Sequence, residues 1–168
     1  IVACKFEKYE ATTRVRDIIV QVGKSGVVTP VAELEPAQIA GTIVSRASLH
    51  NVDVINTLGV RVGDVVVVEK AGKIIPHVVR VETYLRDPDE PRPPYVFPTK
   101  CPSCGAELRR DPDGVFIRCP DPECPAQFRE RLAFFGSKSA MDIDGIGDSV
   151  VEKLTAPSLV GLLEEPRV

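Results

Sequence analysis

The residues with the clearest chemistry in this chain are four cysteines between residues 99 and 128. They form two pairs, Cys101 with Cys104 and Cys119 with Cys124. A Cys-x-x-Cys turn lets two thiolates reach one ion, and a short hairpin through Asp113-Gly114 would bring the second pair to the same ion. Since all four ligands are sulfur, no position remains for water or substrate, and the pattern predicts a structural zinc site. A disulfide pair or four buried free thiols are the alternatives.

Two further positions could bind phosphate. Lys5 stands in the apolar run IVACKF, either as a surface lysine whose stem lies along apolar neighbours or as a functional cation. Gly145 and Gly147 bracket one aliphatic residue at the expected start of a helix. Backbone N–H groups exposed there could seat a phosphate, although such a turn could equally be a simple connection. Cys4, by contrast, is expected to be a small buried hydrophobe.

The elements that would position these residues begin with a β-rich first half. β-branched and alternating runs predict strands at 15–22, 27–34, 39–49, 64–70 and 74–82, with Pro30 marking an edge or a bulge. Apolar spacing predicts a helix over 51–58, closed by Gly59. Five strands with a helix between the third and fourth favour an OB-fold barrel, and an SH3-like barrel is the alternative.

The second half predicts smaller modules. Five prolines between Arg86 and Pro98 predict an extended linker. An amphipathic helix is expected over 125–137, with its phenylalanines and Leu132 on one face, and a second helix follows the glycine turn. Together these helices would form a helix-hairpin-helix, which typically grips a DNA backbone without reading its sequence. The predicted fold class is therefore mainly β with small α: an OB-fold barrel, a Cys4 zinc finger and a helix-hairpin-helix segment.

Composition narrows the class of protein. The 168 residues are 43% hydrophobic and 27% charged, as in an ordinary globular protein. A net charge of −3 argues against coating nucleic acid by charge alone. The apolar runs are too short to span a bilayer, so no membrane partner is expected. Thiolate cysteines favour a reducing compartment, hence a cytoplasmic location. An opening at Ile1 within an apolar run suggests a fragment.

The order of these modules resembles the middle of bacterial NAD-dependent DNA ligases. The matching segments, besides Lys5-Phe6 and the four-cysteine finger, are EATTRVRDI, QVGKSGVVTPVAELEP, SRASLHN, RVGDVVVVEKAGKIIPHVV, CPAQFRERL and AMDIDGIG. The resemblance implies five parts: the terminal strand of a nucleotidyltransferase domain (1–7), an OB-fold domain (8–84), a linker (85–98), a Cys4 zinc finger (99–127) and a truncated helix-hairpin-helix segment (128–168).

The resemblance also implies roles for individual residues. Lys5 matches the family's lysine that contacts the adenylate phosphate, which makes it both a catalytic and a cofactor-binding candidate. Lys24 and Ser25 match an Arg-Thr pair, and Lys70, Ile74 and Ile75 match an Arg-x-x-x-Val-Ile element that meets the DNA minor groove. Because lysine replaces arginine twice, a bidentate phosphate contact becomes a point charge. Gly145 and Gly147 complete the expected DNA contacts.

The family's Lys-x-Asp-Gly motif, whose lysine attacks NAD, does not occur in this sequence. The isolated chain is therefore expected to be inactive. The parent enzyme would use NAD and Mg²⁺ to seal nicks in replication and repair. Expected partners are nicked double-stranded DNA and the adenylation domains of the same parent chain, and a monomer is expected. There are two alternatives. One is a non-enzymatic binding module with an OB fold and a zinc ribbon, and the other is a structural interaction domain stabilised by zinc.

Overall fold

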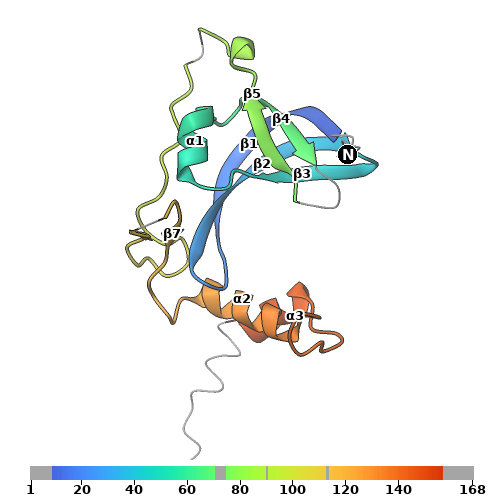
Figure 1. Cartoon of the computed structure of the whole chain (residues 1–168), viewed down its shortest axis with the longest axis vertical. Helices are drawn as coiled ribbons and strands as arrows, with labels where there is room; N and C mark the ends of the chain where they lie inside the picture. Colours follow the sequence, from blue (N-terminus) through green and yellow to red (C-terminus); the bar gives the residue numbers. More distant parts are fainter. Residues whose placement is uncertain (1–8, 71–74, 90, 113, 157–168) are drawn as a thin grey trace, which may run out of the picture. The chain divides into compact units, whose positions relative to one another are not determined.

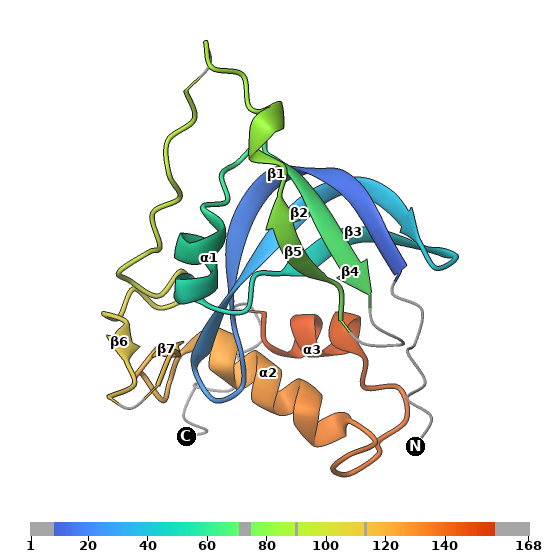
Figure 2. The ribbon, with the colours of Figure 1, turned by 45° about the horizontal axis from the view of Figure 1, so that its top comes forward.

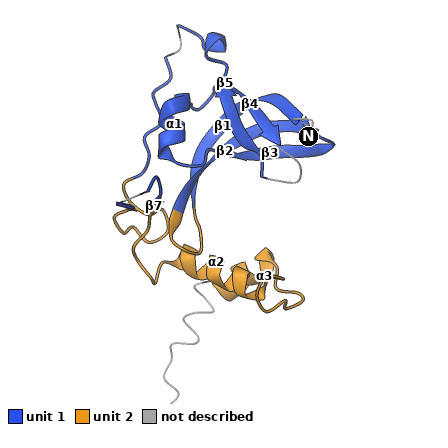
Figure 3. Ribbon diagram, in the orientation of Figure 1, with its two compact units in different colours: residues 1–21, 28–98, 110–117 blue, residues 22–27, 99–109, 118–168 orange. Residues whose placement is uncertain are grey.

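A computed structural model describes residues 9–70, 75–89, 91–112 and 114–156. Within these ranges the chain forms two compact units, coloured separately in Figure 3. The barrel unit takes the described residues of 1–21, 28–98 and 110–117, and the finger unit takes those of 22–27, 99–109 and 118–168. Both units are therefore discontinuous in sequence, and each is described here by itself.

Five strands form the barrel. They are β1 (Tyr9–Val22), β2 (Val27–Ile39), β3 (Thr42–Ser48), β4 (Val65–Lys70) and β5 (His77–Val81). Their order in the sheet is β1-β4-β5-β3-β2, and an additional pairing of β1 with β2 closes the ring. Figures 1 and 2 show the long, curved β1 and β2 wrapping around the shorter strands. The closed five-stranded barrel confirms the predicted OB-type architecture.

The barrel interior is filled by aliphatic side chains from every strand. On β4, Val66 and Val68 join this core, and Val67, which points to the other face of the strand, is also buried. The helix α1 (Val52–Leu58) lies between β3 and β4 in the chain, as the sequence predicted, and Ile55 joins the core. Asn51 caps its first turn through the Val54 N–H, and Gly59 ends it at a φ of 59°.

The observed strands differ from the predicted ones at their ends. β1 and β2 are longer than expected because they continue as a twisted ribbon. Pro30 is not at an edge, since it is fully buried and its carbonyl accepts the Leu49 N–H at 3.0 Å. The irregularity in the β2–β3 pairing falls instead between Glu33 and Ala37. The last strand begins after Pro76, because proline cannot donate to the ladder.

The proline-rich segment after β5 is extended, as predicted, but it packs on the barrel. It follows a single 3₁₀ turn, η1 (Thr83–Leu85). Arg86 donates from Nε at 2.9 Å and from Nη2 at 2.6 Å to the carboxylate of Asp64, which also accepts the Arg61 N–H at 2.8 Å. Further along, Tyr95 and Phe97 pack against the core. The segment is therefore part of the barrel unit and not a free spacer.

The remaining elements are two short strands and two helices. β6 (Arg109–Arg110) pairs with β7 (Ile117–Arg118), and the helices α2 (Pro125–Gly136) and α3 (Asp148–Leu154) follow. No helix in the described part of the chain is long and apolar enough to cross a membrane.

The helix α2 forms where it was predicted, but its aromatic face is not buried. Phe128, Phe134 and Phe135 are 53%, 41% and 48% exposed, and the buried positions are Gln127 and Gly136. The close contact at the end of α2 is Gly136 against Ile146, where an added Cβ would come within 2.7 Å of the isoleucine. The predicted helix is therefore confirmed with its phenylalanines partly exposed, and the helix-hairpin-helix itself stays a prediction.

Candidate metal centre and nucleic-acid contacts

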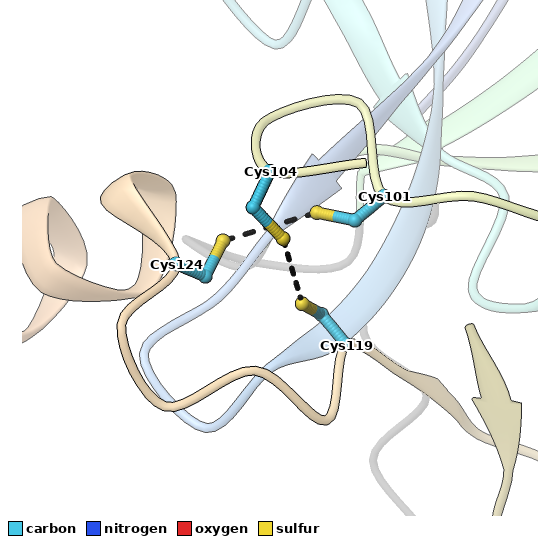
Figure 4. A group of neighbouring side chains, drawn as sticks. All are labelled: Cys101, Cys104, Cys119 and Cys124. Carbon is cyan, nitrogen blue, oxygen red and sulfur yellow. Dashed lines mark hydrogen bonds between the residues drawn. The ribbon is translucent and has the colours of Figure 1, made fainter. Parts of the chain in front are cut away.

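The four predicted zinc ligands converge in the finger unit. The sulfur atoms of Cys101, Cys104, Cys119 and Cys124 all lie within 4.8 Å of one another. Two of the separations are 3.8 Å, between Cys101 and Cys124, and 3.5 Å, between Cys104 and Cys119 (Figure 4). Four sulfurs bound tetrahedrally to zinc would lie about 3.8 Å apart, given Zn–S bonds of about 2.3 Å. The donor set and its spacing fit a closed structural zinc site, and none of these four cysteines is in a disulfide.

Local backbone geometry brings each sulfur into place. At the first pair, the Gly105 N–H donates to the Cys101 carbonyl at 2.9 Å, and Gly105 has a φ of 75° that favours glycine. At the second pair, Cys124 is the residue before α2, and Pro125 fills the first helical position, where no N–H is needed. Cys101 and Cys104 therefore come from a tight turn, Cys119 follows β7 directly, and Cys124 is the residue before α2.

A glutamine holds the loop between the second pair. Gln127 is buried, and its Nε2 donates to the carbonyls of Cys119 at 3.0 Å and Asp121 at 2.9 Å. Sequence reasoning missed this residue. The available signal was its position in the first turn of α2, three residues after the last ligand, where a side chain can reach back to the preceding loop.

The turn between β1 and β2 contacts the loop between Cys119 and Cys124 through Gly26. The Cys119 N–H donates to the Gly26 carbonyl at 2.9 Å. A Cβ at residue 26 would lie 2.6 Å from the Cys119 carbonyl oxygen, and Gly26 also has a φ of 79°. Only glycine fits this position without a shift of the ligand loop.

Burial affects the protonation of one ligand, Cys119. Burial raises the pKa of the Cys119 thiol above its ordinary value. A buried thiol that retains its proton must release it when a metal ion binds, so metal binding is coupled to pH.

Lys24 and Ser25 were predicted to contact DNA beside the Lys70–Ile75 turn. They lie in the finger unit, whereas Lys70 and Ile75 lie in the barrel unit, so their proximity stays a prediction. The ammonium of Lys24 sits 3.0 Å from the ring centroid of Phe134, which is a cation–π contact. Arg118 Nη1 donates to the Ser25 carbonyl at 3.3 Å.

Lys70 and Ile75 line one groove on the barrel unit. The lining residues are Thr42, Ile43, Val44, Ser45, Arg46, Lys70, Ile75 and Pro76. Ile75 is 72% exposed, and Lys70 Nζ donates to Thr42 Oγ1 at 2.6 Å. An exposed isoleucine beside a cation can contact a partner that has both apolar and anionic groups.

The other predicted site residues fall into two groups. Lys5, Phe6 and Ile74 lie outside the described residues. Gly145 has a φ of 88°, and Gly147 is the N-cap residue directly before α3. An added Cβ would meet nothing within 4 Å at either position. Their backbone faces open space, and their role in phosphate binding stays a prediction.

Fold and site together define a class of protein in which an OB-fold barrel carries a Cys4 zinc finger. Comparison with family models gives the particular family. Residues 12–90 match the NAD-dependent DNA ligase OB-fold domain, and residues 100–126 match the NAD-dependent DNA ligase C4 zinc finger domain. The two matches together cover more than half of the chain, which belongs to the NAD-dependent DNA ligase family.

Curated relatives are similar along nearly the whole chain. A DNA ligase of Rhodopirellula baltica is 59% identical over 160 residues, covering 95% of this chain and 22% of the relative. DNA ligases of Halalkalibacterium halodurans and Bacillus subtilis are 51% and 50% identical over 159 residues, each covering 95% of this chain and 24% of the relative. The chain thus spans about a quarter of the length of these relatives.

Proposed function

We propose that this chain is the DNA-clamping part of an NAD-dependent DNA ligase that seals single-strand nicks in duplex DNA. The observation that carries the proposal is the adjacency of two domains, each matched by a model of this one family, in a chain that is 59% identical to a named DNA ligase. In the parent protein a 3′-hydroxyl would be joined to an adenylated 5′-phosphate. NAD and Mg²⁺ would support that chemistry in the whole enzyme, with Lys5 at the adenylate phosphate.

On this proposal the barrel grips the minor groove through the end of β4 and the segment before β5. Lys70 neutralises a phosphate, while Ile75, with Ile74, lies against sugars. Lys24 and Ser25 contact phosphate from the turn between β1 and β2, and the backbone at Gly145 and Gly147 contacts phosphate from the start of α3. The exposure of Ile75 in a groove that also holds Lys70 supports the first part. Such contacts need not read base edges, as befits an enzyme that accepts any nick sequence.

The test is salt-dependent binding of nicked duplex by the full-length parent protein. Lys24→Ala and Lys70→Ala should each flatten the slope of log affinity against log salt by about one unit, because one phosphate contact is lost. Ile75→Ala should weaken binding and leave the slope unchanged. Arg16→Ala, an exposed cation on β1, serves as the control. Wild-type affinity and slope in all three site variants would place DNA on another face.

The enzymatic part of the proposal has its own test. The parent protein incubated with radiolabelled NAD should become adenylated, whereas this chain alone should not. Lys5→Ala in the parent should depress adenylation or sealing by a large factor, because a cation preorganised at a reacting phosphate stabilises the transition state. A parent protein that takes no label and seals no nick would overturn the ligase assignment.

We also propose that the parent acts as a monomer in the bacterial cytoplasm. The support for the location is chemical, because four cysteines arranged for a metal ion stay thiolates most readily in a reducing compartment. Sedimentation of the purified parent protein checks the oligomeric state, and a dimer in the absence of DNA would contradict it.

A further inference from the structure

The groove on the barrel unit has a second exposed isoleucine that the DNA-binding assignment does not use. Ile43, at the start of β3, is 77% exposed and lines the same groove as Ile75. It follows the hairpin turn between β2 and β3, where Ala40 and Gly41 both have positive φ. In Figure 2 this hairpin and the end of β4 lie on the same side of the barrel. Two β-branched apolar side chains thus line one groove from separate segments of the chain.

The residue before Ile43 orients the cation of the groove. The hydroxyl of Thr42 donates to the Ile39 carbonyl at 2.8 Å and accepts from Lys70 Nζ at 2.6 Å. A hydroxyl has one hydrogen, so its use toward Ile39 leaves only lone pairs facing Lys70. The Lys70 ammonium keeps further hydrogens for a partner outside the protein.

A second cation lies along the same groove. Arg46, on β3, is paired with Glu33 at 3.3 Å, and its side chain is 61% exposed. An apolar strip flanked by cations is complementary to the sugar faces and phosphates of a nucleic-acid backbone. Charge complementarity therefore favours duplex DNA as the occupant over an apolar protein segment.

We propose that the start of β3 supplies the second half of the barrel's DNA contact: Ile43 lies against deoxyribose opposite Ile75, and Thr42 is a positioning residue that holds Lys70 toward a phosphate. This inference rests on the proposed function and adds residues to that site. The groove then meets the minor groove with two apolar edges that lie against sugars, so the contact reads no base edges.

The first experiment removes the apolar edge. In the full-length parent protein, Ile43→Ala should weaken binding of nicked duplex about fivefold to tenfold, because most of the branched side chain loses its burial against DNA. The slope of log affinity against log salt should not change, since no charge is lost. Val96→Ala is the matched control, because Val96 is 81% exposed and lies outside this groove. Two duplexes with different nick sequences should show the same loss.

The second experiment tests positioning. Thr42→Val should weaken binding and reduce the salt slope by a fraction of a unit, and Thr42→Ser, which keeps the hydroxyl, should restore both. In a Lys70→Ala background Thr42→Val should have no further effect, because the two side chains act on one phosphate. A loss from Thr42→Val that persists in the Lys70→Ala background would assign Thr42 to folding and overturn this role.

The outcomes distinguish a failure of this inference from a failure of the proposed DNA-binding function on which it rests. If Ile43→Ala binds nicked duplex like the wild type while Ile75→Ala and Lys70→Ala bind it more weakly, the inference is wrong. The assignment of this face to DNA then still holds. Wild-type binding by all three variants overturns the DNA face itself. Loss of a protein partner by Ile43→Ala, with DNA binding intact, assigns the groove to protein and overturns the inference.

Discussion

At the scale of single residues, Gly26 is constrained by both its backbone and its surroundings. Its φ is 79°, and its missing side chain leaves room for the Cys119 carbonyl. Gly105, in the same unit, has a φ of 75°, but an added Cβ would meet nothing within 4 Å. The two glycines therefore separate the cost of a strained backbone from the cost of a steric clash.

Replacing each glycine by alanine should give different results. Gly105→Ala should destabilise the finger unit by about 1–2 kcal/mol, the cost of a left-handed backbone for a residue with a Cβ. Gly26→Ala should cost about 1–3 kcal/mol more, because the Cys119 loop must move to relieve the clash. Denaturant unfolding followed by a probe in the finger unit measures both values. Equal losses would mean that the ligand loop moves freely.

Tyr95 gives the barrel unit a pH dependence. Burial raises the pKa of Tyr95, and the negative charge of Asp17 raises it further. In the unfolded chain a tyrosine ionises near pH 10. Below that pH both states keep the proton and the contribution of Tyr95 to stability is complete. Above it the unfolded state loses its proton first, so the free energy of unfolding falls until the folded-state tyrosine also ionises.

This pH dependence can be measured by urea denaturation between about pH 9 and 11, around the ordinary tyrosine pKa. The wild-type chain should lose stability faster with rising pH than Tyr95→Phe. Tyr84→Phe is the control, because Tyr84 is exposed and should leave the slope unchanged. A Tyr95→Phe slope equal to that of the wild type would contradict the assignment.

At the scale of elements, one buried carboxylate attaches the proline-rich segment to the barrel. Asp64 is 1% exposed and accepts hydrogen bonds from Arg86 and from the Arg61 backbone. Arg92, further along the segment, lies 4.0 Å from the same carboxylate. Removing one partner of a buried pair leaves the other charge without compensation.

Asp64→Ala should therefore destabilise the barrel unit by about 3–5 kcal/mol. The matched control is Asp53→Ala, which removes the partner of Arg110 from an exposed pair. Exposed pairs contribute about 0.2–1 kcal/mol, so this control should stay close to wild type. Thermal unfolding of the barrel compares the two variants, and equal shifts in Tm would show that the Asp64 contacts stabilise the barrel no more than an exposed pair does.

Local signals in the sequence predicted most of the elements and the metal ligands. Cysteine spacing predicted the four sulfurs, and β-branched runs with a glycine stop predicted the strands and α1. The supporting contacts were not predicted because their partners are distant in sequence. Arg118 and Ser25 are 93 residues apart, and Asp64 and Arg86 are 22 apart. No local pattern marks Gly26 as a neighbour of Cys119, since its role depends on tertiary packing. For Gln127 the only local signal was its position in the first turn of α2.

At the scale of the whole molecule, zinc should stabilise residues that are far from the cysteines in sequence. The finger unit includes residues 22–27, and Gly26 bonds to the ligand Cys119. Cys124→Ser, or a chelator, should release the metal and raise amide hydrogen exchange at residues 22–27 as well as at 99–109 and 118–136, because metal binding supplies folding free energy. The β4 amides serve as an internal reference. Unchanged exchange at 22–27 after metal loss would contradict this coupling.

The discontinuous finger unit also imposes an order on protein synthesis. Ser25 is made 93 residues before Arg118, the side chain that donates to it. At a translation rate of about 5–20 residues per second, the turn would wait roughly 5–20 s for that partner. During this interval β1 and β2 can already pair, while the turn between them has neither the finger nor the metal beside it. Completion of this unit is therefore a late event on the ribosome, and it depends on zinc being available only after Cys124 has emerged.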